Sequence, residues 1–185
     1  MSNKAIFLDR DGTINVDKGF VYKVEDFEFL PGATEGLKIL HEAGFLLIII
    51  TNQSGIARGY YTEEDFESLN SWMLTELEKH GVHITAVYYC PHLPREEGEE
   101  SIPSELKQYR INCLCRKPKL ELFERAIKDF NIDLSQSFAI GDKPRDCAIC
   151  EVTNCRGFLI TKNMQKDKQT ASSLLDAAKK IIKVI

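Results

Sequence analysis

The chain has 185 residues and a formal net charge of −4, and 43% of its residues are apolar. This length predicts a single domain, residues 1–185, with a proper hydrophobic core. The acidic balance excludes a broad basic surface, so we expect no nucleic-acid partner. The longest apolar run, residues 45–50, is too short to cross a bilayer, and the first residues do not resemble a signal peptide. We therefore expect a cytoplasmic protein without membrane contact, and a monomer because the pattern leaves no exposed apolar helix face.

Short apolar runs alternate with longer helical periodicities along the chain. Each run is continuously apolar, which is typical of parallel strands covered on both faces. The alternation predicts an α/β fold, a single Rossmann-like parallel sheet with helices on both faces. In chain order we predict a strand at 5–8, a helix at 34–43, a strand at 46–50, a helix at 63–79, a strand at 86–90, a helix at 120–130, strands at 137–140 and 157–160, and a helix at 171–182.

Boundary residues support two of these helices. Thr62 precedes three acidic residues, which predicts a hydroxyl cap and a favourable first turn for the second helix. Gly44 and Gly81 stand where glycines commonly end helices. We therefore expect sharp ends for the first two helices.

Residues 93–112 interrupt the alternation. This insert is rich in glutamate and lacks apolar periodicity, and strand–helix alternation resumes after it. We expect a loop inserted in the domain rather than a linker. No other stretch is long enough to form a second domain, so we expect no large cap over the sheet.

Two aspartates follow the first predicted strand directly, in the order Asp9-Arg10-Asp11-Gly12-Thr13. Ligands of parallel sheets bind at the carboxyl ends of the strands. Two carboxylates this close repel each other unless a cation lies between them, and Mg2+ prefers carboxylate and phosphate oxygens. Taken alone, the segment is equally consistent with an aspartate-rich turn that has no chemistry.

Polar groups at three further places favour a catalytic site. Each lies at the end of a predicted strand or in a loop before a helix, so the parallel sheet would gather them at one edge. Together they offer hydroxyl, amide, carboxylate and cationic groups for a phosphate and a divalent cation. They are Thr51, Asn52, Gln53 and Ser54 after the second strand, Arg116 and Lys117 before the third helix, and Gly141, Asp142, Lys143 and Asp146 after the fourth strand.

These groups resemble the four signatures of the haloacid dehalogenase superfamily of phosphotransferases. The signatures read Asp9-x-Asp11-Gly12-Thr13, Thr51, Lys117 and Gly141-Asp142-x3-Asp146, in the order of that family and across nearly the whole chain. The resemblance implies a phosphoric monoester hydrolase that depends on Mg2+ and forms an aspartyl-phosphate.

The resemblance also implies a role for each residue. Asp9 would attack phosphorus, and Asp11 would act as general acid and then as general base. Thr51 and Lys117 would bind the phosphoryl oxygens. Mg2+ would be held by Asp9, Asp142 and the backbone carbonyl of Asp11, and Asp146 would orient Lys117 or a metal-bound water.

Three cysteines and a histidine bracket the insert. Cys90 and His92 follow the third strand, and Cys113 and Cys115 lie just before Arg116. Three thiols and one imidazole form the ligand set of a closed tetrahedral zinc site. We expect a structural Zn2+ that clamps a loop of about residues 90–115. The alternative is a pair of buried thiols and an unrelated surface histidine.

Three further cysteines, Cys147, Cys150 and Cys155, follow the last signature. Their spacing would suit a second metal, but no fourth ligand lies near in the sequence. We interpret them as small buried apolar residues.

The zinc cluster and the missing cap narrow the choice within the superfamily. The segment 15–21, the run 51–59 and the zinc loop resemble the heptose bisphosphate phosphatases. This implies hydrolysis of the 7-phosphate of a heptose 1,7-bisphosphate, in the biosynthesis of activated heptose for lipopolysaccharide. Arg116 would bind the second, non-reacting phosphate with its planar fork. The substrate-binding residues implied by the resemblance are Arg10, Asp17, Gly19, Phe20, Asn52, Gln53, Ser54, Arg116 and Lys143.

Two alternatives remain open. Histidinol-phosphate phosphatases share the catalytic and zinc pattern, and their cationic substrate would suit the acidic insert, with Glu96, Glu97, Glu99 and Glu100. From another class, the chain could be a zinc-stabilised module that binds phosphate without catalysis.

Overall fold

The structure is a computed structural model that describes residues 2–97, 103–162 and 169–185. Its centre is one six-stranded sheet in the order β3-β2-β1-β4-β5-β6, in which every neighbouring pair is parallel. This confirms the predicted α/β class. The strands are β1 (Ala5–Leu8), β2 (Leu46–Asn52), β3 (Ala86–Cys90), β4 (Phe138–Gly141), β5 (Arg156–Ile160) and β6 (Thr170–Ala171).

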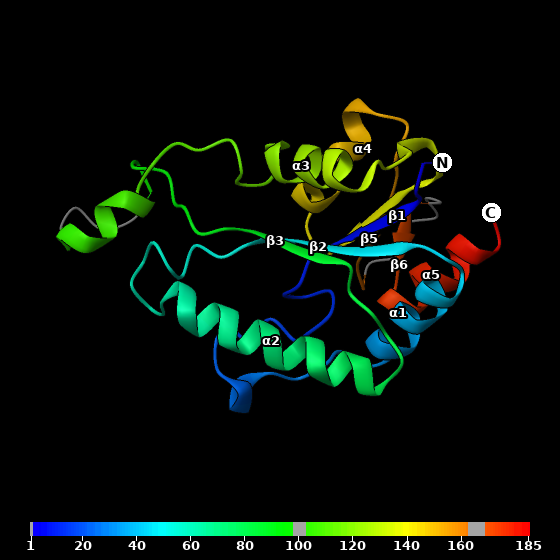
Figure 1. The fold of residues 1–185 in the computed structure, drawn as a ribbon, viewed down its shortest axis with the longest axis horizontal. Helices are drawn as coiled ribbons and strands as arrows, with labels where there is room; N and C mark the ends of the chain where they lie inside the picture. Colours follow the sequence, from blue (N-terminus) through cyan, green and yellow to red (C-terminus); the bar gives the residue numbers. More distant parts are fainter. Residues whose placement is uncertain (1, 98–102, 163–168) are drawn as a thin grey trace.

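Helices cover both faces of the sheet, as Figure 1 shows. They are α1 (Ala33–Glu42), α2 (Glu63–Lys79), α3 (Glu121–Phe130), α4 (Ala148–Val152) and α5 (Leu174–Ile182). Alternate residues of β1 serve two cores. Ile6 and Leu8 pack with α1, α2 and α5, whereas Ala5 and Phe7 pack with α3 and α4. All four side chains are at most 1% exposed, which explains why the strand reads as an unbroken apolar run.

The helix boundaries follow the local signals. Thr62 accepts a hydrogen bond from the Asp65 amide and Asp65 returns one to the Thr62 amide, a capping box that starts α2 at Glu63. The last predicted helix begins later than expected. Thr170 and Ala171 pair with β5 as strand β6, and Ser173 then caps α5.

Short 3-10 helices complete the fold. They span Val24–Asp26, Ser104–Tyr109, Leu134–Gln136 and Pro144–Cys147. Of the helices in the described ranges, none combines the length and the apolar character that crossing a membrane requires.

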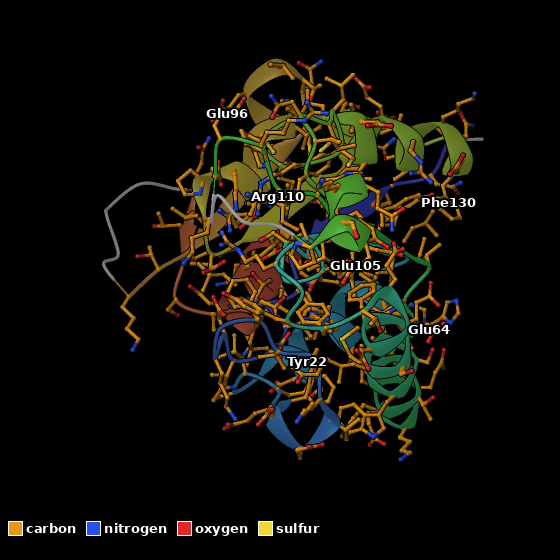
Figure 2. All side chains as sticks on the ribbon, turned by 90° about the vertical axis from the view of Figure 1, so that its left-hand side faces the viewer. Tyr22, Glu64, Glu96, Glu105, Arg110 and Phe130 are labelled. Atoms are coloured by element: carbon orange, nitrogen blue, oxygen red, sulfur yellow. The ribbon has the colours of Figure 1, made fainter. Side chains whose placement is uncertain are left out.

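The insert extends from the end of β3, on the side of the sheet where the strands finish (Figure 1). Its second half is anchored, because the Tyr109 hydroxyl donates to Glu63 at the start of α2 over 2.7 Å. Leu93 is fully buried, and its amide donates to the Tyr109 carbonyl. In Figure 2, which views this edge, Glu105 and Arg110 of the insert lie above Tyr22. Residues 98–102, and with them Glu99 and Glu100, lie outside the described residues.

Candidate active site

The predicted signature residues meet at the carboxyl edge of the sheet. The chain leaves β1 for β2 on one side and reaches β4 on the other, so β1 stands at the point where the strand order reverses. Ligands of open α/β sheets bind at such a point. A cavity of about 250 Å³ opens there. It is lined by Asp9, Asp11, Asp17, Gly19, Phe20, Thr51, Asn52, Gln53, Ser54, Tyr61, Arg116, Asp142, Lys143 and Arg145.

A buried lysine joins two aspartates beneath this cavity. The Lys117 ammonium lies 2.8 Å from Asp9 and 2.7 Å from Asp146, and it also donates to the Ile50 carbonyl at 2.6 Å. Burial raises the pKa of Asp9 to about 7, while the charge of Lys117 opposes this. Burial by itself lowers the pKa of Lys117, but the charges of Asp9 and Asp146 outweigh it and the pKa is raised. Lys117 is therefore an ammonium at neutral pH, as binding of a phosphoryl group requires.

We expect Lys117→Met to lower the free energy of unfolding by about 3–5 kcal/mol, because removing one partner of a buried ion pair leaves the other charge uncompensated. Urea unfolding would measure this. Lys128→Met on the exposed face of α3 is the matched control and should leave the midpoint unchanged. Equal midpoints for both variants would contradict the role of Lys117 as the buried counter-charge.

Asn52 holds the backbone of this lysine in place. Its side-chain amide donates to the Lys117 carbonyl at 3.1 Å and accepts from the Lys117 amide at 3.0 Å. Both ends of the Asn52 side chain are thus occupied by the protein. Although Asn52 lines the cavity, these contacts indicate that it positions Lys117; binding of substrate by Asn52 stays a prediction.

Three carboxylates lie close enough to share one cation. Oxygen atoms of Asp9, Asp142 and Asp146 are all within 4.8 Å of one another. Gly12, at φ +85°, makes room for this, because a Cβ there would lie 2.6 Å from the Asp142 carboxylate. All-oxygen ligation by carboxylates next to a phosphate position suits Mg2+. The residues present therefore fit the ion, with Asp146 in the group and the Asp11 carboxylate outside it.

The Asp11 carboxylate is held by three side chains. Arg10 donates to both of its oxygens, at 3.1 and 3.0 Å, and Asn15 and Gln53 each donate to one, at 2.9 and 3.0 Å. Arg10 is 1% exposed and also donates to the Val21 carbonyl. Arg10 was expected to bind substrate, but it is buried beneath Asp11 and is not among the residues that line the cavity.

The other predicted substrate-binding residues lie where expected, around the cavity. Lys143 is paired with Asp142 at 2.7 Å, and the Arg116 guanidinium donates to the His92 carbonyl at 3.4 Å. Sequence reasoning missed Tyr61 and Arg145 as lining residues. The position of Arg145 between Asp142 and Asp146 was an available signal, but nothing in the sequence places Tyr61 beside the strand ends.

The predicted zinc ligands form a compact cluster at the end of β3. Cys90 lies 3.1 Å from Cys115 and 3.6 Å from Cys113 between sulfurs, and the His92 Nδ1 lies 3.7 and 3.2 Å from the sulfurs of Cys90 and Cys115. In a tetrahedral zinc site with metal–ligand bonds of about 2.0–2.3 Å, the ligand atoms lie at similar distances from one another. The hydrogen bond between the Cys90 and Cys115 sulfurs and, to a smaller extent, the contact with His92 lower the pKa of Cys115 to about 5, although burial opposes this. The low pKa favours the thiolate that binds metal. The four residues thus fit a closed zinc site.

The remaining three cysteines do not form a comparable group within the described ranges. Cys155 is 4% exposed, and Cys147 and Cys150 pack against the same core as α3. This agrees with their interpretation as small apolar residues.

Comparisons with known proteins point the same way as the geometry. A family model described as polynucleotide kinase 3 phosphatase matches residues 4–181. The chain is similar to the D-glycero-beta-D-manno-heptose-1,7-bisphosphate 7-phosphatase of Haemophilus ducreyi, with 46% identity over 88% of this chain and 85% of the relative. It is 39% identical to that of Pasteurella multocida, over 98% and 96%. The D,D-heptose 1,7-bisphosphate phosphatase of B. bronchiseptica, solved with magnesium and phosphate, matches with a TM-score of 0.80 and 25% identity, over 98% of this chain and 99% of that one.

Proposed function

This chain belongs to the D-glycero-beta-D-manno-heptose-1,7-bisphosphate 7-phosphatase family of the haloacid dehalogenase superfamily, and on that premise we propose that it hydrolyses the 7-phosphate of a heptose 1,7-bisphosphate. The observation that carries the proposal is the convergence of Asp9, Asp142 and Lys117 at the end of β1, where the strand order of the sheet reverses. It is the arrangement that a phosphate monoesterase with an aspartate nucleophile needs.

The proposed reaction has two steps. Asp9 attacks phosphorus in line, the sugar oxygen leaves, and the aspartyl-phosphate is then hydrolysed by water, so one difficult step becomes two easier ones. Asp11 protonates the leaving oxygen and later accepts a proton from the water. Lys117 and Thr51 bind the phosphoryl oxygens. Such electrostatic stabilisation must be large, because uncatalysed monoester hydrolysis requires rate enhancements up to ~10^21.

We propose two metals for this chain. Mg2+ at Asp9, Asp142 and the Asp11 carbonyl would neutralise charge between the anionic nucleophile and the anionic phosphate. Asp146 already uses its oxygens for Lys117 and for the Lys143 amide, so it orients the site. Zn2+ at the four-ligand cluster would be structural, because all four positions of a tetrahedron are taken by protein.

The charge around the cavity favours a bisphosphate over histidinol phosphate. Arg116, Lys143 and Arg145 line it, and of the described residues of the insert, including Glu96 and Glu97, none does. Although four aspartates line the same cavity, these three cations offer binding groups that a second phosphate could use and a substrate amine could not. The absence of a nucleic-acid partner, the monomeric state and the cytoplasmic location stay predictions.

An assay of kcat/KM tests the proposal. We expect heptose 1,7-bisphosphate to exceed histidinol phosphate and p-nitrophenyl phosphate by about 10²-fold or more, roughly 2.7 kcal/mol of transition-state binding, and activity to need Mg2+. Histidinol phosphate as the best substrate would establish the alternative activity, and the absence of turnover with any ester would favour the non-catalytic binding module.

A further inference from the structure

A chain of hydrogen bonds connects a buried tyrosine to Asp11. The Tyr61 hydroxyl donates to the Gln53 Oε1 at 2.5 Å. The Gln53 Nε2 in turn donates to the Asp11 Oδ2 at 3.0 Å and to the Thr51 hydroxyl at 2.9 Å. Gln53 is 2% exposed and Tyr61 is 5% exposed, so water competes little for these bonds.

The tyrosine determines which way the glutamine amide faces. Burial raises the pKa of Tyr61, so the phenol keeps its proton although the Gly55 amide donates to its oxygen and opposes this. The phenolic hydroxyl directs its proton to Gln53. The Gln53 Oε1 is thereby committed as acceptor, and the NH2 group must face the Asp11 carboxylate and Thr51. A reversed amide would place the Gln53 oxygen against an oxygen of the Asp11 carboxylate, where neither atom can donate a hydrogen bond.

The ring of Tyr61 is held on two sides. It stacks on Tyr22 with centroids 5.1 Å apart and an angle of 14° between the planes. Gly55 faces its edge so closely that a Cβ there would lie 2.1 Å from the ring. A ring confined in this way holds its hydroxyl at a defined point relative to β2.

Gln53 differs from the other two groups that hold Asp11. Arg10 and Asn15 belong to the same loop as Asp11. Gln53 follows β2, and it contacts Thr51 and Asp11 through one nitrogen. Of the side chains that donate to the Asp11 carboxylate in the described ranges, Gln53 is the one that fixes the carboxylate relative to the phosphate-binding end of the neighbouring strand.

We propose that Tyr61 is a positioning residue that, through Gln53, aims the Asp11 carboxyl at the oxygen of the leaving group. This inference rests on the proposed function, because it assumes that Asp11 is the general acid. It also changes the role of Gln53 from contact with the sugar to orientation of Asp11.

The dependence on the leaving group tests the proposal. A sugar alkoxide needs a proton as it leaves, whereas p-nitrophenolate does not. Because a positioned general acid contributes about 10²–10⁴-fold, we expect Tyr61→Phe to lower kcat/KM for the sugar bisphosphate by about 10-fold or more. For p-nitrophenyl phosphate we expect kcat/KM to stay within about 3-fold. Tyr60→Phe, the same change at the adjacent exposed residue, is the matched control and should alter neither value.

A second experiment asks whether the effect passes through Gln53. Residues that act through one network are not additive, so Tyr61→Phe should cause little further loss in a Gln53→Leu background. Equal losses for both substrates in Tyr61→Phe, or additive losses in the double variant, would overturn the proposal. If the wild-type enzyme cleaves p-nitrophenyl phosphate but not the sugar bisphosphate, the proposed substrate is wrong. The same comparison with glycerol 3-phosphate then decides the role of Tyr61.

Discussion

Asp9→Asn is expected to lower kcat by at least about 10⁴-fold, the scale seen when a covalent nucleophile is removed. An amide cannot form the acyl phosphate, and no other described carboxylate lies within hydrogen-bonding reach of Lys117 except Asp146. The variant should fold, because the amide oxygen can still accept from Lys117. Steady-state kinetics would measure the loss, and acid-quenched samples should contain no phosphoenzyme.

Asp129→Asn serves as the control for this change. Asp129 lies on the exposed side of α3, where it accepts from the Tyr88 hydroxyl. Its variant should match the wild type in kcat, and circular dichroism should give the same spectrum for all three proteins. A loss of less than about 10²-fold in Asp9→Asn would remove Asp9 as the nucleophile.

Cys115→Ser is expected to release the zinc and to destabilise the protein strongly. A structural zinc site contributes folding free energy directly. A loss of about 4 kcal/mol or more would lower Tm by roughly 8–16 °C in a chain of this size. Because Cys115 is two residues before Lys117, we expect kcat/KM to fall as well. Elemental analysis should find about one zinc per wild-type chain, the count for a single closed site, and almost none in the variant.

The matched control is Cys150→Ser, which makes the same chemical change at a thiol outside the cluster. It should keep its zinc and most of its activity. Wild-type protein purified without chelator and free of zinc, or a Cys115→Ser variant with full metal content, would show that the cluster is a set of buried thiols instead.

The fold was predictable where short-range signals decide it. The boundaries of β1, β3 and α2 agree with the expected ones, because a buried strand requires a continuous apolar run and a capping box fixes the start of a helix. Strand β6 has two residues and helix α4 has five, which is too short for a pattern of apolar residues to reveal either element in the sequence. Thr170 joins the sheet because Leu159 is available as a partner, a contact that the local sequence does not reveal.

The candidate site was predictable as a set of groups but not as a network. The rule that parallel strands end at one edge was enough to bring Asp9, Thr51 and Asp142 together. It could not show that Asn52 faces Lys117, because those residues are 65 positions apart. Nor could it show that Arg10 points into the core, since an arginine beside two aspartates reads equally well as a ligand for phosphate.

The place of each strand in the sheet predicts where homologous proteins tolerate insertions and deletions. Central β1 divides its side chains between two cores and ends directly at Asp9, so deleting one residue there would exchange the faces and withdraw the nucleophile. Strand β3 forms an edge, and the chain beyond it is held by Cys90 and Glu63 rather than by the sheet. Length polymorphism among homologues should therefore concentrate after β3 and be absent between residues 5 and 12.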